Sequence, residues 1–394
     1  MTSEWRTIRA ADFIDFNPRL SLKKGDIATK VAMDKLKPFT KKIPETEKAE
    51  FNGGAKFCNG DTVMARITPC LENGKTAYVD MLDDGEIGFG STEFIVMRAK
   101  TGISDPQFVY YTAINPVFRN VAIKSMVGSS GRQRVQQSVL EELELSVPDL
   151  DEQRRIGDFL ARIDEKIALN DRINDNLEQQ AQSYFQELFV DNADPEWAIG
   201  TISDLGTIVG GSTPSKAKPE YYTESGIAWI TPKDLSINQS KFVSHGENDI
   251  TELGLKNSSA AIMPEGTVLF SSRAPIGYIA IAAGEVTTNQ GFKSVVPKPE
   301  IGTPFVYFFL KNTLPVIEGM ASGSTFKEVS GSTMKNVSAV IPDAETLAKF
   351  SDFCAPIFAQ QRILEEQNQS LATLRDNLLP KLMSGEIDVS AVQL

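Results

Sequence analysis

Two long stretches of the chain repeat apolar residues in alternating steps of four and three, the heptad spacing of helices that pack on one another. In the first stretch the seam consists of Ile156, Leu160, Ile163, Ile167, Leu177, Ala181, Tyr184 and Leu188. In the second stretch it consists of Phe350, Phe353, Ile357, Leu364, Leu371, Leu374 and Leu378. The pattern predicts two long helices that pack on each other. Two ordinary amphipathic helices, each packed on its own domain, are the alternative.

Three polar or ring-constrained residues qualify this helical pattern. Asn170 and Asn174 fall on the first seam, where a buried asparagine fixes the register and orientation of paired helices at a cost in stability. Pro356 lies inside the second pattern and lacks a backbone N–H. We therefore expect a kink or a break in the first turns of the second helix.

The remaining sequence contains short apolar or β-branched runs bounded by Gly, Pro, Asn or Asp, which is typical of strands. These runs include VMARI (63–67), AYVDML (77–82), FIVMR (94–98), TVLFSS (267–272) and YIAIAA (278–283). An apolar stretch with helical character, QFVYY (107–111) or PFVYF (304–308), occurs in each half of the chain. The globular regions are therefore predicted to be mixed α/β.

The sequence contains an internal repeat, so the chain consists of two copies of one unit. SMVGSSGRQRVQQSVLEELELSVPD (125–149) aligns without a gap on GMASGSTFKEVSGSTMKNVSAVIPD (319–343). Each copy is a globular region followed by a long helix. The predicted fold class is α+β, with a first domain over 1–148, a first helix over 149–192, a second domain over 193–342, and a second helix with a C-terminal tail over 343–394.

The chain has 40 Lys and Arg residues and 52 Asp and Glu residues, which gives a net charge of −12. A negative net charge by itself argues against nucleic-acid binding. Most of this charge lies in the helical segments, where 149–192 holds 5 basic and 11 acidic residues and 343–394 holds 4 and 8. The two globular regions are therefore near neutral or mildly acidic, which permits DNA binding. Acidic helices suit a protein partner better than phosphates.

Composition also excludes several classes of protein. The single histidine, His245, lies in a polar stretch and is predicted to be a surface loop residue, so zinc hydrolases and histidine-base enzymes are disfavoured. Cys58, Cys70 and Cys354 are scattered and form no CxxC pair. We therefore expect neither a cysteine metal site nor a disulfide framework. The chain has no run of 18 apolar residues and a polar N-terminus, so we expect a cytoplasmic protein without a membrane span.

Two strings of the sequence imitate catalytic motifs without their full chemistry, and a third motif is absent. Asn115-Pro-Val-Phe resembles the adenine methyltransferase tetrapeptide but has valine in place of its second proline. No GxxxxGK[ST] sequence is present, so no ATP-binding loop of that kind is encoded. Pro148-Asp149 followed by Asp164-Glu165-Lys166 imitates a nuclease site, but the latter residues are predicted to lie on a solvated helix face.

Several long blocks resemble Type I restriction–modification specificity subunits. LSVPDLDEQRRIGDFLARIDEKI (145–167) resembles the start of their first conserved region, and NLLPKLMSGEIDV (377–389) the end of the second. GDTVMARITPCLENGKTAYVD (60–80), FGSTEF (89–94), ITPKDLS (230–236), GTVLFSSRAPIGYIAIA (266–282) and TTNQGFKS (287–294) resemble blocks of their target-recognition domains. The resemblance covers nearly the whole chain, although the second repeat has ETLA (345–348) where the first has EQRR (152–155).

The resemblance implies a non-catalytic subunit that binds double-stranded DNA. Each recognition domain would read one half of a split target, and two antiparallel coiled-coil helices, related by a pseudo-two-fold internal repeat, would set the spacer between the halves. The implied partners are two methyltransferase subunits and, for restriction, two motor–nuclease subunits. S-adenosylmethionine and ATP are expected on those partners, with no cofactor or metal in this chain. A coiled-coil scaffold without DNA readout and, less favoured, a DNA-modifying enzyme are the alternatives.

Polar and basic residues near these blocks are the predicted DNA contacts, because such side chains reach phosphates and base edges. In the first domain they are Arg66, Lys75, Ser91, Thr92, Arg132, Gln133 and Arg134. In the second domain they are Thr213, Lys216, Lys233, Ser272, Arg273, Asn289, Gln290 and Lys327. Phe94 and Phe292, which adjoin two of these clusters, are predicted to be core residues.

Overall fold

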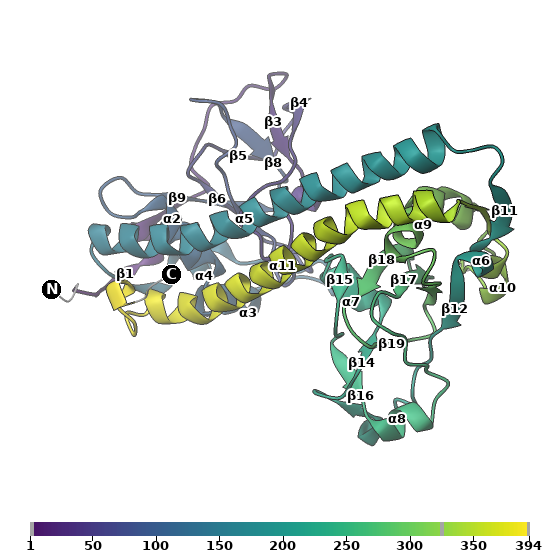
Figure 1. The fold of residues 1–394 in the computed structure, drawn as a ribbon. Coiled ribbons are helices and arrows are strands. Elements are labelled where there is room, and N and C mark those ends of the chain that lie inside the picture. Colours follow the sequence, from purple (N-terminus) through teal and green to yellow (C-terminus); the bar gives the residue numbers. More distant parts are fainter. Residues whose placement is uncertain (1–3, 324–326, 392–394) are drawn as a thin grey trace. The chain divides into compact units, whose positions relative to one another are not determined.

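The computed structural model describes residues 4–323 and 327–391, and it divides the chain into two compact units (Figure 1). Unit 1 contains the residues up to Asn170 together with those from Gln367 onward. Unit 2 contains Asp171–Glu366. Each unit therefore combines one globular region with part of both long helical segments. Ser324, which the repeat alignment pairs with Ser130, lies outside the described residues.

Unit 1 is built on two four-stranded sheets and a two-stranded ribbon. The first sheet has the order β2-β9-β6-β7 and is antiparallel: Ile14–Phe16, Phe94–Ala99, Thr62–Ala65 and Thr76–Tyr78. The second has the order β4-β3-β8-β5, with β3 and β8 parallel: Glu47–Glu50, Ile27–Val31, Gly88–Gly90 and Ala55–Phe57. The ribbon pairs β1 with β10: Arg6–Arg9 and Glu144–Val147.

Two helices of unit 1 begin at residues whose side chains cap them. The Asp105 carboxylate accepts the Phe108 N–H, and the Asn115 side chain accepts the Val117 N–H. Each of these two consecutive helices also has a proline in its first turn, where the missing N–H costs no hydrogen bond. The helical segments of this globular region are α1, η1, α2, α3 and α4: Ala10–Phe13, Met33–Lys35, Pro106–Ile114, Pro116–Lys124 and Gln137–Glu141. The aromatic side chains of α2 are buried and form the centre of the core.

Unit 2 repeats this plan with different sheets. The larger sheet has the order β12-β20-β17-β18-β15: Gly206–Gly210, Lys293–Pro297, Val268–Ser272, Ile276–Ala282 and Phe242–Val243. The smaller has the order β13-β16-β14-β19: Tyr222–Thr223, Asn248–Ile250, Ile227–Ile230 and Thr287–Thr288. A ribbon again pairs β11 with β21: Ala198–Thr201 and Ser338–Ile341. The helical segments are α6, η3, α7, α8, α9 and α10: Ile202–Leu205, Pro219–Tyr221, Pro232–Ile237, Glu252–Lys256, Thr303–Gly319 and Gly331–Lys335.

The two long helices contribute to the core of both units. They are α5, which continues into a π-helical turn η2, and α11, which is followed by the short η4: Leu150–Gln186, Glu187–Asp191, Ala344–Met383 and Val389–Ala391. In unit 1 the first half of α5 packs with the last turns of α11, and in unit 2 the last turns of α5 pack with the first turns of α11. The helices thus pair antiparallel in each unit, and the predicted fold class is confirmed.

The second helix departs from the prediction at Pro356 and at Leu374, and Phe353, although its ring centre lies 4.5 Å from that of Tyr184 on α5, is also 39% exposed. Helix α11 runs without a break through Pro356, so the prediction of a break there is wrong. Leu374 is 39% exposed, whereas the adjacent Arg375 is only 5% exposed. Placing Leu374 on the buried seam is therefore wrong, because an ion pair with α5 turns the next residue inward. Ile156, Leu160, Ile163 and Leu364 are buried.

Asparagine side chains lie at the contact between α5 and α11 in both units. In unit 1 the fully buried Asn170 donates its Nδ2 to Asn368 Oδ1 at 2.9 Å. In unit 2 the Asn174 backbone carbonyl accepts a hydrogen bond from Gln361 Nε2 at 3.2 Å. These polar contacts favour one register of the pair, because a shift would break the hydrogen bonds of Asn170 Nδ2 and Gln361 Nε2, although the Oδ1 atoms of Asn170 and Asn174 are buried without a partner among the described residues.

A buried ion pair joins the two helices in unit 1. Asp164 Oδ1 lies 2.7 Å from Arg375 Nη1, and Asp164 Oδ2 accepts the Tyr111 hydroxyl at 2.5 Å. Lys41 reaches the same site, where its Nζ lies 3.3 Å from the Tyr111 hydroxyl, and burial lowers the pKa of Lys41 to about 8. Asp164 is thus not on a solvated helix face as predicted, because Arg375 supplies the charge that permits its burial.

Unit 2 has a comparable cluster around Glu178 of α5. Lys241 Nζ lies 2.7 Å from Glu178 Oε2 and 2.8 Å from Gln361 Oε1 of α11, and it sits 3.5 Å from the centre of the Phe358 ring. Tyr307 of α9 donates its hydroxyl to Glu178 at 3.1 Å. A lysine from the globular region, a tyrosine and a helix carboxylate therefore attach each domain to the helices of its own unit.

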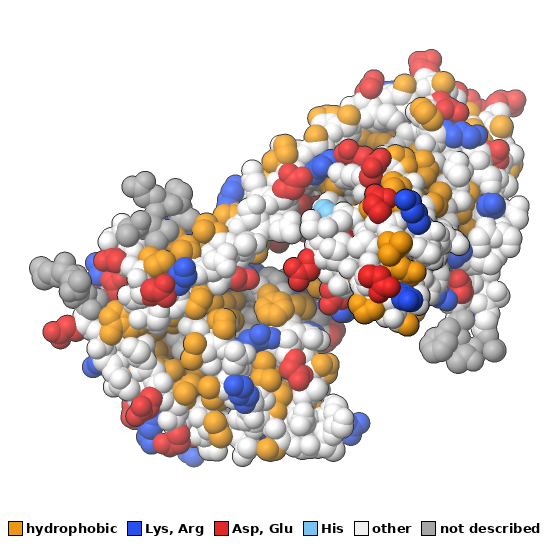
Figure 2. Space-filling view, turned by 90° about the horizontal axis from the view of Figure 1, so that it is seen from below, with side chains coloured by type: hydrophobic (Ala, Val, Ile, Leu, Met, Phe, Trp, Pro, Cys, Tyr) orange, Lys and Arg blue, Asp and Glu red, His pale blue; other side chains and the backbone are white. Residues whose placement is uncertain are grey.

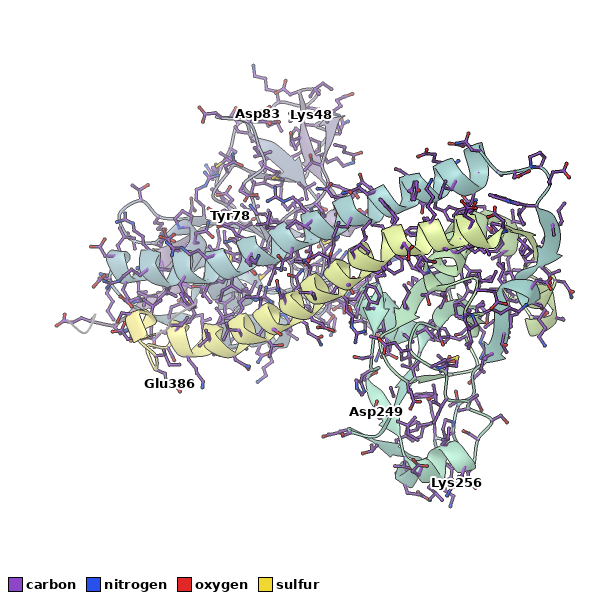
Figure 3. All side chains as sticks on the ribbon, viewed as in Figure 1. Lys48, Tyr78, Asp83, Asp249, Lys256 and Glu386 are labelled. Carbon is purple, nitrogen blue, oxygen red and sulfur yellow. The ribbon has the colours of Figure 1, made fainter. Side chains whose placement is uncertain are left out.

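The carboxylate of Glu86 contacts the β4-β3-β8-β5 sheet of unit 1, and its partners Lys48 and Asp83 are labelled in Figure 3. Glu86 accepts the Thr29 N–H at 3.0 Å, the Thr29 hydroxyl at 2.6 Å and the Lys48 ammonium at 2.7 Å. The Lys48 hydrogen bond, followed by that of Thr29, lowers the pKa of Glu86 from 4.5 to about 2. This carboxylate therefore stabilises the sheet only when it is ionised.

We predict that Glu86→Gln lowers the free energy of unfolding at pH 7 by about 1–2 kcal/mol. The folded pKa lies below the unfolded one, so the unfolded state binds more protons between pH 4.5 and 2. The contribution of Glu86 is complete above about pH 4.5, and the difference from wild type shrinks as pH falls toward 2. Urea unfolding across this range measures it, with the exposed Glu50→Gln as control. A difference that stays constant below pH 4 would contradict the assignment.

Candidate nucleic-acid interface

Three loop segments of unit 1 that carry predicted DNA contacts lie side by side. The Arg66 N–H donates to the Glu93 carbonyl at 2.9 Å, and the Val135 N–H donates to the Arg66 carbonyl at 2.8 Å. The Thr68 N–H donates to the Gln133 carbonyl at 3.0 Å. The end of β6, the turn before β9 and the hairpin before α4 therefore form one surface. Of the predicted residues, it brings together Arg66, Ser91, Thr92, Gln133 and Arg134.

Unit 2 builds the same arrangement from equivalent segments. The Ser272 N–H donates to the Gly291 carbonyl at 2.7 Å, and the Val329 N–H donates to the Ser272 carbonyl at 3.0 Å. The Ser212 N–H donates to the Thr288 carbonyl at 2.9 Å, which adds the loop after β12. This surface brings together Thr213, Arg273, Asn289, Gln290 and Lys327.

Of the five remaining predicted contacts, four lie away from these loop surfaces or serve the fold, and one lies in the unit 1 hairpin. Ser272 is fully buried, and its hydroxyl lies 3.1 Å from the Gly291 carbonyl, so its prediction as a DNA contact is wrong. Lys75 is half-buried and donates to the Met33 carbonyl at 2.9 Å. Lys233 on α7 pairs with Glu247 at 2.6 Å. Lys216 is exposed in the segment before η3, and Arg132 is exposed in the hairpin of unit 1.

Each loop surface contains an ion pair, with the charges reversed between the units. Arg134 binds both oxygens of Glu93, at 2.6 Å for the shortest contact, and this lowers the pKa of Glu93. At the aligned hairpin position unit 2 has Glu328, which lies 3.5 Å from Arg273 and 3.6 Å from Lys293. These pairs join the hairpins to the neighbouring loops and reduce the net positive charge there.

A groove beside the unit 1 loops contains cations that the sequence did not single out. Its lining includes Arg19, Lys56, Arg66, Thr92 and Phe94. Arg19 follows β2 and Lys56 lies on β5, so neither belongs to a recognisable sequence block. The predicted core positions Phe94 and Phe292 are confirmed, since both are buried. His245 is exposed in a loop, as predicted, with its Nδ1 3.2 Å from Asp249 Oδ1.

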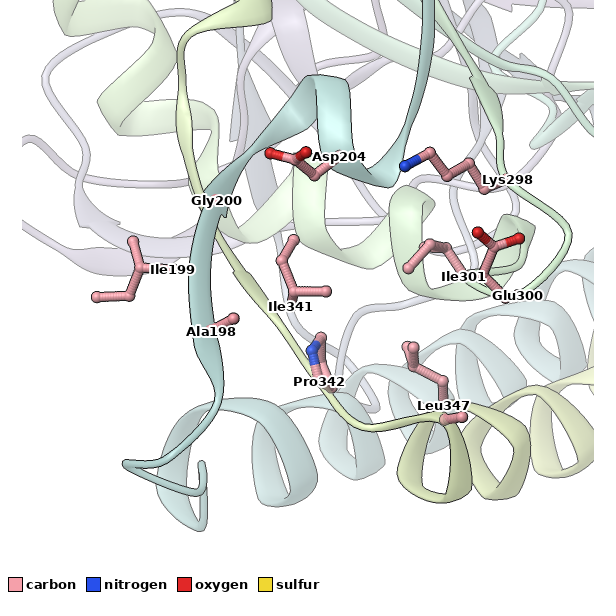
Figure 4. A pocket seen from close by; sticks show the side chains of 11 residues that line it. Ala198, Ile199, Gly200, Asp204, Lys298, Glu300, Ile301, Ile341, Pro342 and Leu347 are labelled. Atoms are coloured by element: carbon pink, nitrogen blue, oxygen red, sulfur yellow. The ribbon is translucent and has the colours of Figure 1, made fainter.

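A second hollow lies in unit 2 between the β11–β21 ribbon and the first turns of α11 (Figure 4). Its lining is largely apolar, including Ile199, Ile341 and Leu347, with Asp204 and Lys298 among its polar residues. None of the predicted DNA contacts lines it, so it is separate from the loop surface.

Figure 2 shows basic and acidic side chains interspersed on the face drawn.

The internal repeat of the chain corresponds to two copies of one known domain. A family model described as the Type I restriction modification DNA specificity domain matches residues 3–179 and again residues 195–374. The chain belongs to this family. It carries two copies of the domain, and each match covers a loop surface and a long helix.

Curated relatives and a solved structure agree with this membership. The Type I restriction enzyme MjaIX specificity subunit of Methanocaldococcus jannaschii is 38% identical over 194 residues, which cover 47% of this chain and 45% of that relative. The HindI specificity subunit of Haemophilus influenzae is 25% identical over 407 residues, covering 83% of this chain and 86% of that relative. The first of these alignments thus spans less than half the length of the relative.

The fold is shared with a crystal structure of the Type I restriction–modification system S subunit from M. genitalium. The TM-score is 0.58 at 16% identity, with 96% of both chains covered. Within the described residues, no helix is long and apolar enough to cross a membrane.

Proposed function

We propose that this chain is the DNA-reading specificity subunit of a Type I restriction–modification complex. The observation that carries the proposal is the repeat of one loop surface in two DNA specificity domains. Each domain reads one half of a bipartite target in double-stranded DNA. A coiled-coil scaffold without DNA readout does not account for two such surfaces at aligned positions.

The chemistry of modification and restriction is proposed to reside on partner subunits. Two methyltransferase subunits supply S-adenosylmethionine and adenine methylation, and two motor–nuclease subunits supply ATP-driven restriction. The absence of a methyltransferase tetrapeptide and of an ATP-binding loop from the sequence supports this division. The acidic helical segments suit protein partners rather than phosphates.

The helix pair is proposed to set the number of base pairs between the two half-sites. Helices α5 and α11 each contribute residues to both units, so the connection between the two domains is helical and not a loop. The contacts of Asn170 with Asn368 and of Asn174 with Gln361 fix the register on either side of the boundary between the units.

We expect a matched insertion of seven residues to lengthen the spacer by about three base pairs. Seven residues preserve the heptad and add about 10.5 Å of helix, and one base pair rises about 3.4 Å. The insertions follow Asp171 in α5 and Glu366 in α11, so both asparagine contacts are retained. The target is first obtained by mapping methylated adenines for the wild-type system. The reconstituted complex is then titrated with duplexes whose half-sites have different spacers.

An insertion in α5 alone is the control, because it shifts the register and leaves the asparagine contacts unmatched. It should weaken binding at every spacer. Specific binding by the doubly inserted complex at the original spacer alone would refute the ruler, whereas a wild-type complex without specific binding would refute the proposed function.

A further inference from the structure

The groove beside the unit 1 loops concentrates positive charge without neutralising carboxylates. Arg19, Lys56 and Arg66 approach it from three separate segments, and no Asp or Glu belongs to its lining. Glu93, whose backbone adjoins Arg66, gives its carboxylate to Arg134 instead. The groove therefore differs from the mixed charge of the neighbouring loops.

The three cations retain unused hydrogen-bonding capacity. Arg66 Nη2 donates to the Val135 carbonyl at 3.3 Å, but its Nε is buried and has no partner among the described residues. Lys56 Nζ donates to the Leu20 carbonyl at 2.9 Å and lies 5.1 Å from the centre of the Phe51 ring. Arg19 is exposed and forms no ion pair with the described part of the chain. The Arg66 Nε is itself inaccessible, so an incoming acceptor would meet the other guanidinium N–H groups of Arg66 and Arg19 and the Lys56 ammonium, which line the groove.

The corresponding place in unit 2 is closed. Ser272 occupies the position of Arg66, since both donate an N–H to the turn before the next strand and accept the N–H of the aligned valine. Counting from the strand pairs Phe16–Met97 and Ile208–Val295, Arg19 corresponds to Gly211. A Cβ on Gly211 would lie 1.9 Å from the Asn289 carbonyl oxygen, so backbone fills this space. The groove is a property of the first domain.

We propose that this groove binds one phosphate group of the DNA backbone, an inference that rests on the proposed function. Arginine presents a planar fork of donors that matches phosphate, and lysine adds a point charge. Phosphate contacts position a protein on the duplex without reading bases. The first domain thus has an anchoring contact that the second lacks, next to Thr92 on the recognition surface.

The test compares a groove variant with a charge-matched control in the reconstituted complex. Arg19→Ala with Lys56→Met removes two groove cations, and Lys166→Ala with Lys256→Ala removes two exposed cations from α5 and α8. Affinity for the mapped target is measured over a range of salt concentrations. We expect the groove variant to reduce the slope of log K against log salt by about 0.9, the value for one phosphate contact. The control should leave the slope unchanged.

Further readouts separate this role from folding and base reading. The exposed Arg19→Ala alone should reduce the slope without a change in thermal unfolding, and Lys56→Arg should retain the wild-type slope. Methylated sequences should keep both half-sites in every variant. An unchanged slope in the groove variant, or an altered first half-site, would overturn the phosphate assignment. Loss of specific binding by the wild type would instead refute the proposed function.

Discussion

Replacing Arg375 with methionine is expected to lower the free energy of unfolding by about 3–5 kcal/mol. The guanidinium is 5% exposed and lies 2.7 Å from Asp164, which is itself 6% exposed. Methionine fills much of the volume but leaves the carboxylate buried with only hydrogen bonds from neutral groups and a more distant lysine. The loss of charge compensation, rather than the loss of packing, dominates the effect.

A double variant distinguishes these causes. Asp164→Leu together with Arg375→Met removes both charges, and apolar replacements of a buried pair are often neutral or stabilising. The double variant should therefore recover most of the stability that the single variant loses. Urea unfolding of unit 1 is followed by the fluorescence of Trp5, with Trp197 and Trp229, which lie in unit 2, replaced by phenylalanine in every variant. The exposed Lys381→Met is the matched control on α11.

If the double variant has the same low free energy of unfolding as Arg375→Met, the electrostatic explanation is wrong. Such a result would show that side-chain packing, and not the charge of Asp164, determines the cost. A loss below about 1 kcal/mol in the single variant would show that Asp164 is hydrated or neutral in the folded protein.

The repeat and the long helices were predictable because their signals are local in sequence. Heptad spacing encodes the buried face of a helix, and the gapless alignment before each helix encodes the duplication. The aligned hairpins indeed occupy equivalent positions, with Val135 and Val329 donating to the same place in their domains. Antiparallel pairing followed from family resemblance rather than from spacing.

The charged interior was not predictable, because its partners are far apart in the chain. Asp164 and Arg375 meet only when α5 and α11 pair, and a heptad pattern assigns the inward position to Leu374 instead. Ser272 shows the same limit for recognition residues, because composition does not reveal that its side chain points into the core. The groove combines Arg19, Lys56 and Arg66 from three segments, and only the fold brings them together.

Exchange of one domain tests whether each domain reads its own half-site. Residues 193–342 are replaced by the corresponding domain of another family member, with Lys241 and Lys311 retained so that Glu178 keeps its partners. Because each unit has its own loop surface, we expect a complete change in one half of the methylated sequence. The other half and the spacer should stay as in the wild type. Wild-type and exchanged systems are compared by mapping methylated adenines across a genome. One altered half-site is the predicted result, and a change in both halves, or in neither, would contradict independent readout by the two domains.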